Sequence, residues 1–269
     1  MDLGLKGKVA IITGANNPQG IGAATVYTLA GEGVKVVVIY KKIPRQYDEK
    51  KTGSDGLDRY YKANSEDAMM VEGTLHTMGA DYLIIEGDIT DEKSVESIYD
   101  HTIKRFGKVD ILINNAAAAD SDDNDTIETL TADVIEDTFN VNVRGTLLMT
   151  REFVKRFKDY GRIINLSTDA AQVFAGQITY GASKAAVEAL TRSIAIEVGR
   201  LGITVNCIAP GPTQTGWIDE KLAKAVIPQI PLGQLIQPQD IADAIAFLAS
   251  ERAAMLTGQV IKVSGGNEL

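Results

Sequence analysis

Short runs of β-branched and other apolar residues alternate with longer amphipathic stretches along nearly the whole chain, and this alternation constrains the fold most. Most of the runs are apolar at successive positions, as in parallel strands whose two faces are both covered by helices. The pattern therefore predicts a doubly wound α/β architecture, a seven-stranded parallel sheet in three layers, with ligands at the carboxyl ends of the strands. The predicted strands are Val9–Thr13, Val34–Tyr40, Tyr82–Glu86, Asp110–Asn114, Arg162–Ser167, Thr204–Ile208 and Gln259–Val263.

No internal repeat or linker divides the 269 residues, so residues 1–269 are interpreted as a single domain. Residues 41–64 interrupt the alternation with 24 residues that show no clear periodicity, which predicts an inserted loop that is functional or disordered. Residues 120–137 carry eight acidic side chains and no Lys or Arg, which predicts a solvated loop entering a helix. Thr90 is the predicted N-cap of the helix that ends at Gly107.

Composition excludes several classes of protein. The 36 acidic side chains outnumber the 27 basic ones, and a net charge of −9 argues against binding to nucleic acid or to an anionic membrane. A single cysteine cannot form an internal disulfide, and two histidines leave little room for a metal site, so we expect no metal. No apolar stretch reaches the length of a membrane span, and we expect a cytoplasmic protein.

A glycine-rich loop follows the first predicted strand and contains Gly14, Gly20 and Gly22, just before a predicted helix over Ala23–Gly31. Glycines there allow backbone N–H groups at a helix N-terminus to approach a pyrophosphate. No Lys-Ser/Thr pair follows Gly20, which excludes a Walker-type loop. The loop therefore predicts a dinucleotide site, although an ordinary glycine-rich turn between strand and helix has the same spacing.

Five further motifs occur in a fixed order, and together with the glycine loop they resemble the short-chain dehydrogenase/reductase family. The resemblance covers essentially the whole chain, and the C-terminal part is similar to the 3-oxoacyl-carrier-protein reductase branch. It implies a Rossmann fold and an oxidoreductase that transfers a hydride between a nicotinamide cofactor and a carbonyl or alcohol. The motifs are Asn114-Asn115-Ala116-Ala117, Asn142, Ser167-Thr168, Tyr180-Gly-Ala-Ser-Lys184 and Pro210-Gly211-Pro212-Thr213, with Asp88-Ile89 after the third predicted strand.

Tyr180 and Lys184 stand four residues apart on a predicted helix and therefore share a face. A nearby cation lowers the pKa of a phenol, which would make Tyr180 a general acid for carbonyl reduction or a base for alcohol oxidation. The resemblance implies that Lys184 also binds the nicotinamide ribose and that Asn142 holds a water in a proton relay. It implies cofactor contacts at Gly14, Asn16, Gly20, Ile21, Gly22, Tyr40, Lys41, Asp88, Ile89, Asn115, Ala116, Tyr180, Lys184, Pro210, Gly211 and Thr213.

Two departures from the family pattern bear on the chemistry. Five residues separate Gly14 from Gly20 where the family has three, which resembles the enoyl reductase branch. That branch separates its Tyr and Lys by six residues, however, and position 187 is Val, so enoyl reduction is the less favoured reaction. The hydroxyl that orients the substrate is Thr168 when counted along the fifth strand and Ser167 when counted back from Tyr180, and both remain candidates.

The end of the second predicted strand decides the choice of cofactor. An acidic residue there binds the free ribose hydroxyl of NAD, whereas basic residues accept the phosphate of NADP. Here Tyr40 stands at that position, followed by Lys41 and Lys42, with Arg45 nearby. The sequence favours NADP over NAD.

The substrate is less well defined. Residues 213–236 correspond to the family's substrate loop, in which Trp217 is either part of an apolar lid or ordinary packing. The acidic run after the fourth strand would repel an anionic substrate, so a small neutral carbonyl or alcohol is preferred over a 3-oxoacyl chain on a carrier protein. A face of Ala182, Ala185, Ala186 and Ala189 favours a homotetramer or homodimer. A catalytically silent NADP-binding regulator or scaffold remains the alternative from another class.

Overall fold

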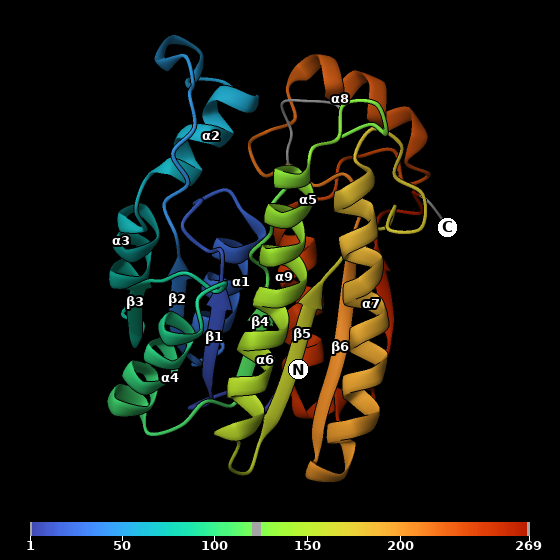
Figure 1. The fold of residues 1–269 in the computed structure, drawn as a ribbon. Coiled ribbons are helices and arrows are strands. Elements are labelled where there is room, and N and C mark those ends of the chain that lie inside the picture. Colours follow the sequence, from blue (N-terminus) through green and yellow to red (C-terminus); the bar gives the residue numbers. More distant parts are fainter. Residues whose placement is uncertain (1, 120–124, 268–269) are drawn as a thin grey trace.

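The computed structural model describes residues 2–119 and 125–267. Its centre is a seven-stranded parallel sheet in the order β3-β2-β1-β4-β5-β6-β7, so the predicted doubly wound architecture is confirmed (Figure 1). The strands lie within three residues of their predicted bounds at either end. They are β1 Val9–Thr13, β2 Lys35–Tyr40, β3 Tyr82–Glu86, β4 Ile111–Asn114, β5 Gly161–Leu166, β6 Ile203–Pro210 and β7 Val260–Val263.

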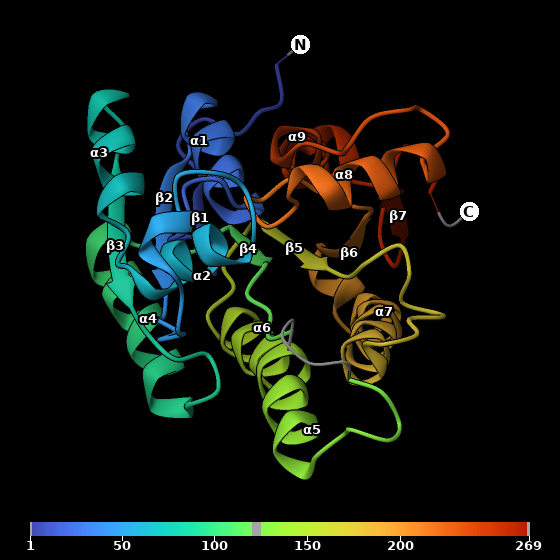
Figure 2. The ribbon, with the colours of Figure 1, turned by 90° about the horizontal axis from the view of Figure 1, so that it is seen from above.

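Helices cover both faces of the sheet (Figure 2). On one face, α1, α3 and α9 bury Val26, Leu75 and Ile245 against the strands. On the other face, α4, α6 and α7 bury Tyr99, Phe153 and Val198. The helices are α1 Ile21–Gly31, α2 Leu57–Ser65, α3 Met69–Thr77, α4 Glu92–Phe106, α5 Ala132–Phe139, α6 Thr146–Lys155, α7 Ile178–Val198, α8 Glu220–Val226 and α9 Pro238–Ala249, with short turns η1 Glu49–Lys51, η3 Gly199–Leu201, η4 Ile227–Gln229 and η5 Glu251–Ala253 and a π-helix η2 Asn140–Gly145.

The order of the strands reverses at β1, which pairs with β2 on one side and β4 on the other. Ile12 of β1 lies opposite Val38 of β2 and Ile113 of β4. The connections that leave β1 and β4 therefore run to opposite faces of the sheet and open a crevice at the carboxyl ends of the strands. Ligands of doubly wound proteins bind in this crevice.

The prediction of an irregular loop over residues 41–64 is wrong, because that segment contains η1 and most of α2. The second helix begins after Gly56, has Asp58 in its first turn and buries only Tyr61, so its short apolar face gives little periodicity in the sequence. The predicted cap of the fourth helix is also corrected by one residue. Asp91, rather than Thr90, accepts the hydrogen bond from the Ser94 N–H, while Thr90 donates to Asp88 instead.

Part of the acidic run, residues 120–124, lies outside the described residues. Thr131 caps the helix α5, as expected for a loop that enters a helix. Asp125, however, is only 5% exposed, so the prediction of a fully solvated run is wrong at this position. Among the described residues, no helix combines the length and apolar character needed to cross a membrane.

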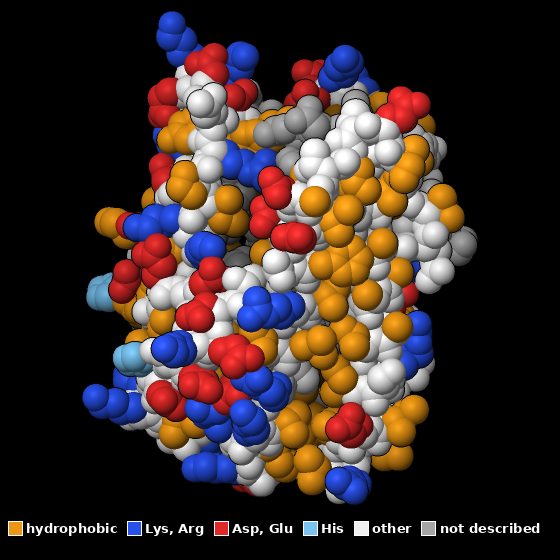
Figure 3. Space-filling model, in the orientation of Figure 1, with side chains coloured by type: hydrophobic (Ala, Val, Ile, Leu, Met, Phe, Trp, Pro, Cys, Tyr) orange, Lys and Arg blue, Asp and Glu red, His pale blue; other side chains and the backbone are white. Residues whose placement is uncertain are grey.

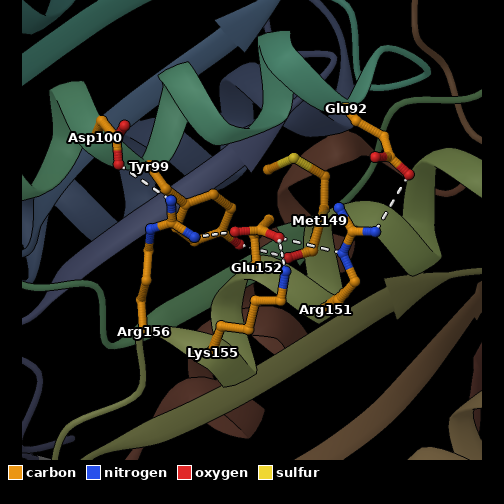
Figure 4. A network of polar contacts seen from close by, with 8 residues as sticks. All are labelled: Glu92, Tyr99, Asp100, Met149, Arg151, Glu152, Lys155 and Arg156. Atoms are coloured by element: carbon orange, nitrogen blue, oxygen red, sulfur yellow. Dashed lines mark hydrogen bonds and ion pairs between the residues drawn. The ribbon is translucent and has the colours of Figure 1, made fainter.

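A buried carboxylate joins the helices on one face of the sheet (Figure 4). Glu152 on α6 is 1% exposed, and its carboxylate lies among three cations from the end of its own helix. Two of these cations also reach α4, since Arg151 binds Glu92 and Arg156 binds Asp100. The three cations are Arg151, Lys155 and Arg156. A single carboxylate therefore organises the contact between α4 and α6.

We predict that Glu152→Gln lowers the free energy of unfolding by about 2 kcal/mol, because charged hydrogen bonds to a buried acceptor are lost while the cations remain. Urea unfolding followed by circular dichroism measures the change. Glu96→Gln, on the exposed side of α4, is the matched control and should change stability by less than about 0.5 kcal/mol. Equal effects of the two substitutions would contradict the role given to Glu152.

Candidate active site

The glycine loop between β1 and α1 packs so closely against its neighbours that two of its positions leave no room for a side chain. A Cβ atom at Gly22 would lie 2.6 Å from the Gly14 carbonyl oxygen, and one at Gly14 would lie 2.7 Å from the Ala116 Cα. Gly14 also has a φ of +68°, which favours glycine. The α1 N-terminus begins at Ile21 after Gly20, without a side-chain cap and without an acidic residue in its first turn. These features fit the pyrophosphate of a dinucleotide.

Asn115, after β4, holds this loop in place. Its side-chain amide donates to the carbonyl oxygens of Thr13 and Gly14 at 2.8 and 2.9 Å. The Thr13 hydroxyl in turn accepts from the N–H groups of Asn115 and Ala116, both at 3.0 Å. The Asn115 side chain therefore braces the loop from the neighbouring strand.

The helix α7 carries Tyr180 and Lys184 at the carboxyl end of β5. The Lys184 ammonium donates to the carbonyl oxygen of Leu166, the last residue of that strand, at 2.8 Å. It also lies 5.5 Å from the centre of the Tyr180 ring. The structure thus brings the two residues of the Tyr-x-x-x-Lys motif together, as their spacing predicts.

Burial changes the acidity of both groups. Lys184 is only 3% exposed, and removal from water lowers the pKa of its ammonium to about 8. Burial also raises the pKa of the Tyr180 phenol above its usual value, with smaller contributions from the phenol of Tyr60 and the carboxylate of Asp169. The expected lowering of the Tyr180 pKa is therefore not found: burial dominates, and the ammonium of Lys184 donates to the end of β5.

Phe174 fixes the ring of Tyr180 from the other side. The two rings meet edge to face with their centres 5.6 Å apart. A Cβ atom at Gly181 would lie 2.7 Å from the Phe174 Cβ, so this contact requires glycine directly after the tyrosine. Phe174 was not singled out from the sequence, because no local pattern relates it to Tyr180.

The two candidate hydroxyls at the end of β5 have different surroundings. The Ser167 hydroxyl is buried and donates to Glu188 on α7 at 2.8 Å. Thr168 is partly exposed, and its hydroxyl lies 3.5 Å from a carboxylate oxygen of Asp169. Ser167 is therefore engaged within the protein interior, which leaves Thr168 as the hydroxyl nearer to the open side.

Asn142 lies within the π-helix η2, an irregularity common at functional sites. Its side chain accepts from the Ala118 N–H at 2.7 Å and donates to the Ala118 carbonyl oxygen at 2.9 Å. It also donates to the Ser183 hydroxyl, which donates to the Tyr180 carbonyl oxygen. Ser183, missed as a site residue, thus links Asn142 to the tyrosine, and its place inside the motif was the available signal.

Asp125 is a second residue that the sequence did not assign to the site. Its carboxylate accepts hydrogen bonds from the Thr179 N–H and from the Thr179 hydroxyl. Its carbonyl oxygen also accepts from the Ile178 N–H at 3.1 Å. Asp125 therefore fixes the first turn of α7, directly before Tyr180.

The residues at the ends of β2 and β3 carry opposite charges. Lys41 binds Asp88 at 2.7 Å, and Lys42 lies 3.5 Å from Glu86. Partial burial raises the pKa of Asp88, but hydrogen bonds from Lys41 and Thr90 outweigh this effect and hold the pKa below its usual value. Tyr40 at the end of β2 and Ile89 after Asp88 are both buried.

The segment after β6 forms the far side of the crevice. Pro210 ends the strand, and the Gly211 N–H donates to Val263 at 3.1 Å. Thr213 donates to the Gly211 carbonyl oxygen and accepts from the Trp217 indole at 3.1 Å. Trp217 is 37% exposed, so its ring is partly packed and partly open to solvent.

Comparisons with known proteins identify the family. A family model described as Enoyl-(Acyl carrier protein) reductase matches residues 56–268. The chain is 34% identical to the NADPH-dependent aldehyde reductase 2 of Arabidopsis thaliana, over 97% of this chain and 94% of the relative. It is 32% identical to the 3-oxoacyl-carrier-protein reductase of Escherichia coli, over 98% of both chains. A blue fluorescent protein from a metagenomic library, solved with NADPH, superposes with a TM-score of 0.81 at 30% identity, over 97% of this chain and 98% of that one.

The chain therefore belongs to the short-chain dehydrogenase/reductase family, and it is an oxidoreductase of that family. The resemblance found in the sequence is thus confirmed. Members of the family bind a nicotinamide cofactor and act on small molecules, and the uncapped N-terminus of α1 behind the glycine loop fits the pyrophosphate of such a cofactor.

The buried lysine predicts a pH dependence of stability. Unfolded Lys184 keeps its proton up to about pH 10.5, whereas the folded chain releases it near pH 8, so its contribution to stability rises with pH between these values. The wild type should gain about 2 kcal/mol relative to Lys184→Met between pH 7.5 and 10. Urea unfolding of both proteins measures the difference.

Lys221→Met, on the exposed side of α8, controls for the removal of a lysine as such. A constant difference between the wild type and Lys184→Met across this range would show that the ammonium keeps its normal acidity.

Proposed function

We propose that the protein is an NADP(H)-dependent reductase of small neutral ketones or aldehydes, with Tyr180 as the proton donor. The observation that carries the proposal is the pairing of Tyr180 with the buried Lys184 on one helix, 5.5 Å from ring centre to ammonium, at the carboxyl end of the parallel sheet. Burial of a cation costs free energy, and buried ionisable groups of this kind cluster at functional sites. Carbonyl reduction is a reaction that uses a cation beside a phenol.

Each residue of the proposed site has a defined role. The bound cofactor supplies the hydride, which this chain's own side chains cannot provide. Thr168 donates a hydrogen bond to the carbonyl oxygen and orients it, and Tyr180 gives that oxygen its proton. Lys184 would hold the ribose hydroxyls of the cofactor. Its positive charge, 5.5 Å from the centre of the Tyr180 ring, favours the ionised phenol and so opposes the effect of burial on the pKa of Tyr180.

Asn142 belongs to this proposal as a positioning residue and as the support of a proton relay. Both amide protons are used by Ala118 and Ser183 and the amide oxygen accepts from Ala118, so the side chain fixes the loop after β4 and the second turn of α7. A water of the relay would be held by the remaining acceptor site of the amide oxygen or by neighbouring groups. A silent NADP-binding scaffold, the alternative function, has no need of this set of contacts around the tyrosine.

We also propose that the protein forms an oligomer through an exposed apolar face. Hydrophobic side chains gather on the face formed by α5, α6 and α7 (Figure 3). Ile135, Ile178 and Ile196 are 40%, 40% and 85% exposed, next to the exposed Ala182 and Ala189. Small residues permit close approach of helices, and an apolar face of this kind fits a homodimer or homotetramer.

The choice of NADP rests on charge at the end of β2. Lys41 and Lys42 follow Tyr40, and no carboxylate on this strand competes for the ribose. Their present partners, Asp88 and Glu86, are partly exposed, so a phosphate with nearly two negative charges can displace them. The Arabidopsis relative is named NADPH-dependent, and the metagenomic protein was solved with NADPH, which supports the same choice.

Tyr180→Phe tests the chemistry. The variant keeps the ring that packs on Phe174 but loses the hydroxyl, so it should bind NADPH normally and lose at least about a thousandfold in kcat. NADPH consumption with a panel of ketones, aldehydes and diketones measures the rate, and quenching of protein fluorescence measures cofactor binding. Turnover near the wild-type rate would refute Tyr180 as the proton donor.

The same assay shows which of the hydroxyls of Ser167 and Thr168 orients the substrate. Thr168→Ala should lower kcat/KM about a hundredfold, since a donor to the developing oxyanion is removed. Ser167→Ala removes only a hydrogen bond to Glu188 and should change kcat/KM much less, while it lowers stability by about 1 kcal/mol. The reverse order of activities would assign the role to Ser167.

Exchange of the charges at the end of β2 tests the cofactor. Each partly exposed charge contact is worth about 1 kcal/mol, so the wild type should prefer NADPH by about ten- to a hundredfold in kcat/KM. Tyr40→Asp combined with Lys41→Ala should shift this preference toward NADH, because the new carboxylate accepts from the free hydroxyl and repels the phosphate. The ratio is measured on one substrate at low and high salt, since salt weakens the preference. A wild type that prefers NADH at both concentrations would falsify the assignment.

A further inference from the structure

The segment that leaves β2 lies over the mouth of the crevice. From Tyr40 it rises above the sheet, and α2 then returns over the carboxyl ends of the strands toward β2 and α3 (Figure 2). The segment closes on itself, because the Ile43 N–H donates to the Asn64 carbonyl oxygen at 3.0 Å. Neither the motifs nor the proposed reaction explains why these residues lie there.

The glycine loop is one anchor of this segment. Asn16 is 5% exposed, and its side-chain amide donates to the Glu66 carbonyl oxygen at 3.0 Å. The same amide lies 3.4 Å from the carbonyl oxygens of Ala63 and Asn64. The C-terminal end of α2 is therefore held directly above the predicted phosphate site.

The segment also meets the two other loops that border the crevice. The Gly56 N–H donates to the Gly216 carbonyl oxygen, in the substrate loop, at 2.8 Å. Arg45 lies 3.5 Å from the Ala119 carbonyl oxygen, in the loop after β4. The insertion therefore spans from the glycine loop to both sides of the crevice.

The insertion also packs on itself. Tyr61 on α2 lies beneath Arg45, with 5.2 Å between the guanidinium and the ring centre. This contact helps to hold α2 to the stretch of chain that leaves β2.

We infer that residues 41–66 form a roof over the cofactor crevice, closed against the substrate loop by the contact of Gly56 with Gly216. This inference deepens the proposed function and rests on it for the identity of the ligand beneath the roof. The cofactor enters and leaves when the roof parts from the substrate loop. The roof excludes water from the hydride-transfer step while it is closed.

The junction between the roof and the substrate loop, at Gly56 and Gly216, has few contacts that oppose its opening. Beyond Gly56 the insertion and the substrate loop diverge around a groove of about 760 Å³, lined by Ser54 and Asp55 on one side and by residues of 214–224 on the other. A second hydrogen bond, from Asn17 to the Thr215 carbonyl oxygen at 3.2 Å, ties the substrate loop to the glycine loop rather than to the roof. Few contacts must therefore break to free the roof at this side.

A disulfide across the junction tests the gate. A Cβ atom at Gly56 would lie 3.8 Å from the Cβ of Asp219, which is the usual separation in a disulfide. In Gly56→Cys/Asp219→Cys, oxidation should slow the binding and release of NADPH by at least about tenfold, and reduction should restore both. Stopped-flow fluorescence measures the rates, and mass spectrometry verifies the disulfide.

The reduced double variant controls for strain at Gly56, whose φ is +150°, and for loss of the helix cap that Asp219 supplies. The native Cys207 is fully buried and does not compete. NADH is measured in parallel, so a wrong choice of cofactor does not affect the result. Equal rates in the oxidised and reduced forms, or failure of the disulfide to form, would overturn the gate.

Failure of the proposed reaction has a different signature: the wild type reduces no carbonyl compound of the panel, while the disulfide still changes the rates of cofactor binding. The two results therefore separate the roof from the chemistry.

Discussion

Burial of the Lys184 ammonium is the interaction on which the site depends. Removal of a cation from water is costly, and here the Leu166 carbonyl oxygen at the end of β5 provides a hydrogen bond in return. That bond ties the middle of the catalytic helix to the end of the central sheet. The cost is visible in the lowered pKa of about 8, and a ligand that accepts hydrogen bonds from the ammonium would relieve it.

Buried polar side chains hold the loops around this lysine, and each joins segments far apart in the sequence. Asn115 ties the loop after β4 to the glycine loop, Asn142 ties the same region to α7, and Asp125 fixes the start of α7. Because a buried donor or acceptor without a partner costs about 1–3 kcal/mol, such contacts favour one arrangement over its alternatives. The reactive side chains are thus positioned by the ends of strands and by these braces together.

The insertion over residues 41–66 is the part of the site that the family motifs do not describe. The proposed catalytic residues could be found from motifs, since they follow strands that the hydrophobic pattern already predicts. The roof could not be predicted in this way. Asn16 and Gly56 donate to backbone carbonyl oxygens, which every residue carries, so the sequence does not indicate these contacts. The short helix α2 was missed for the related reason that only Tyr61 on it is buried.

The sequence by itself determined the parallel sheet, the glycine loop and the pairing of Tyr180 with Lys184. These depend on local periodicity, on steric room at glycine and on the four-residue repeat of a helix. Only the tertiary structure decided that Ser167 turns inward to Glu188 and that Asp125 caps α7. It likewise placed the ammonium of Lys184 on the end of β5, so that burial governs the acidity of both groups. Each of these outcomes depends on the burial of one side chain against a distant segment, and burial is a property of the packed chain rather than of any stretch of it.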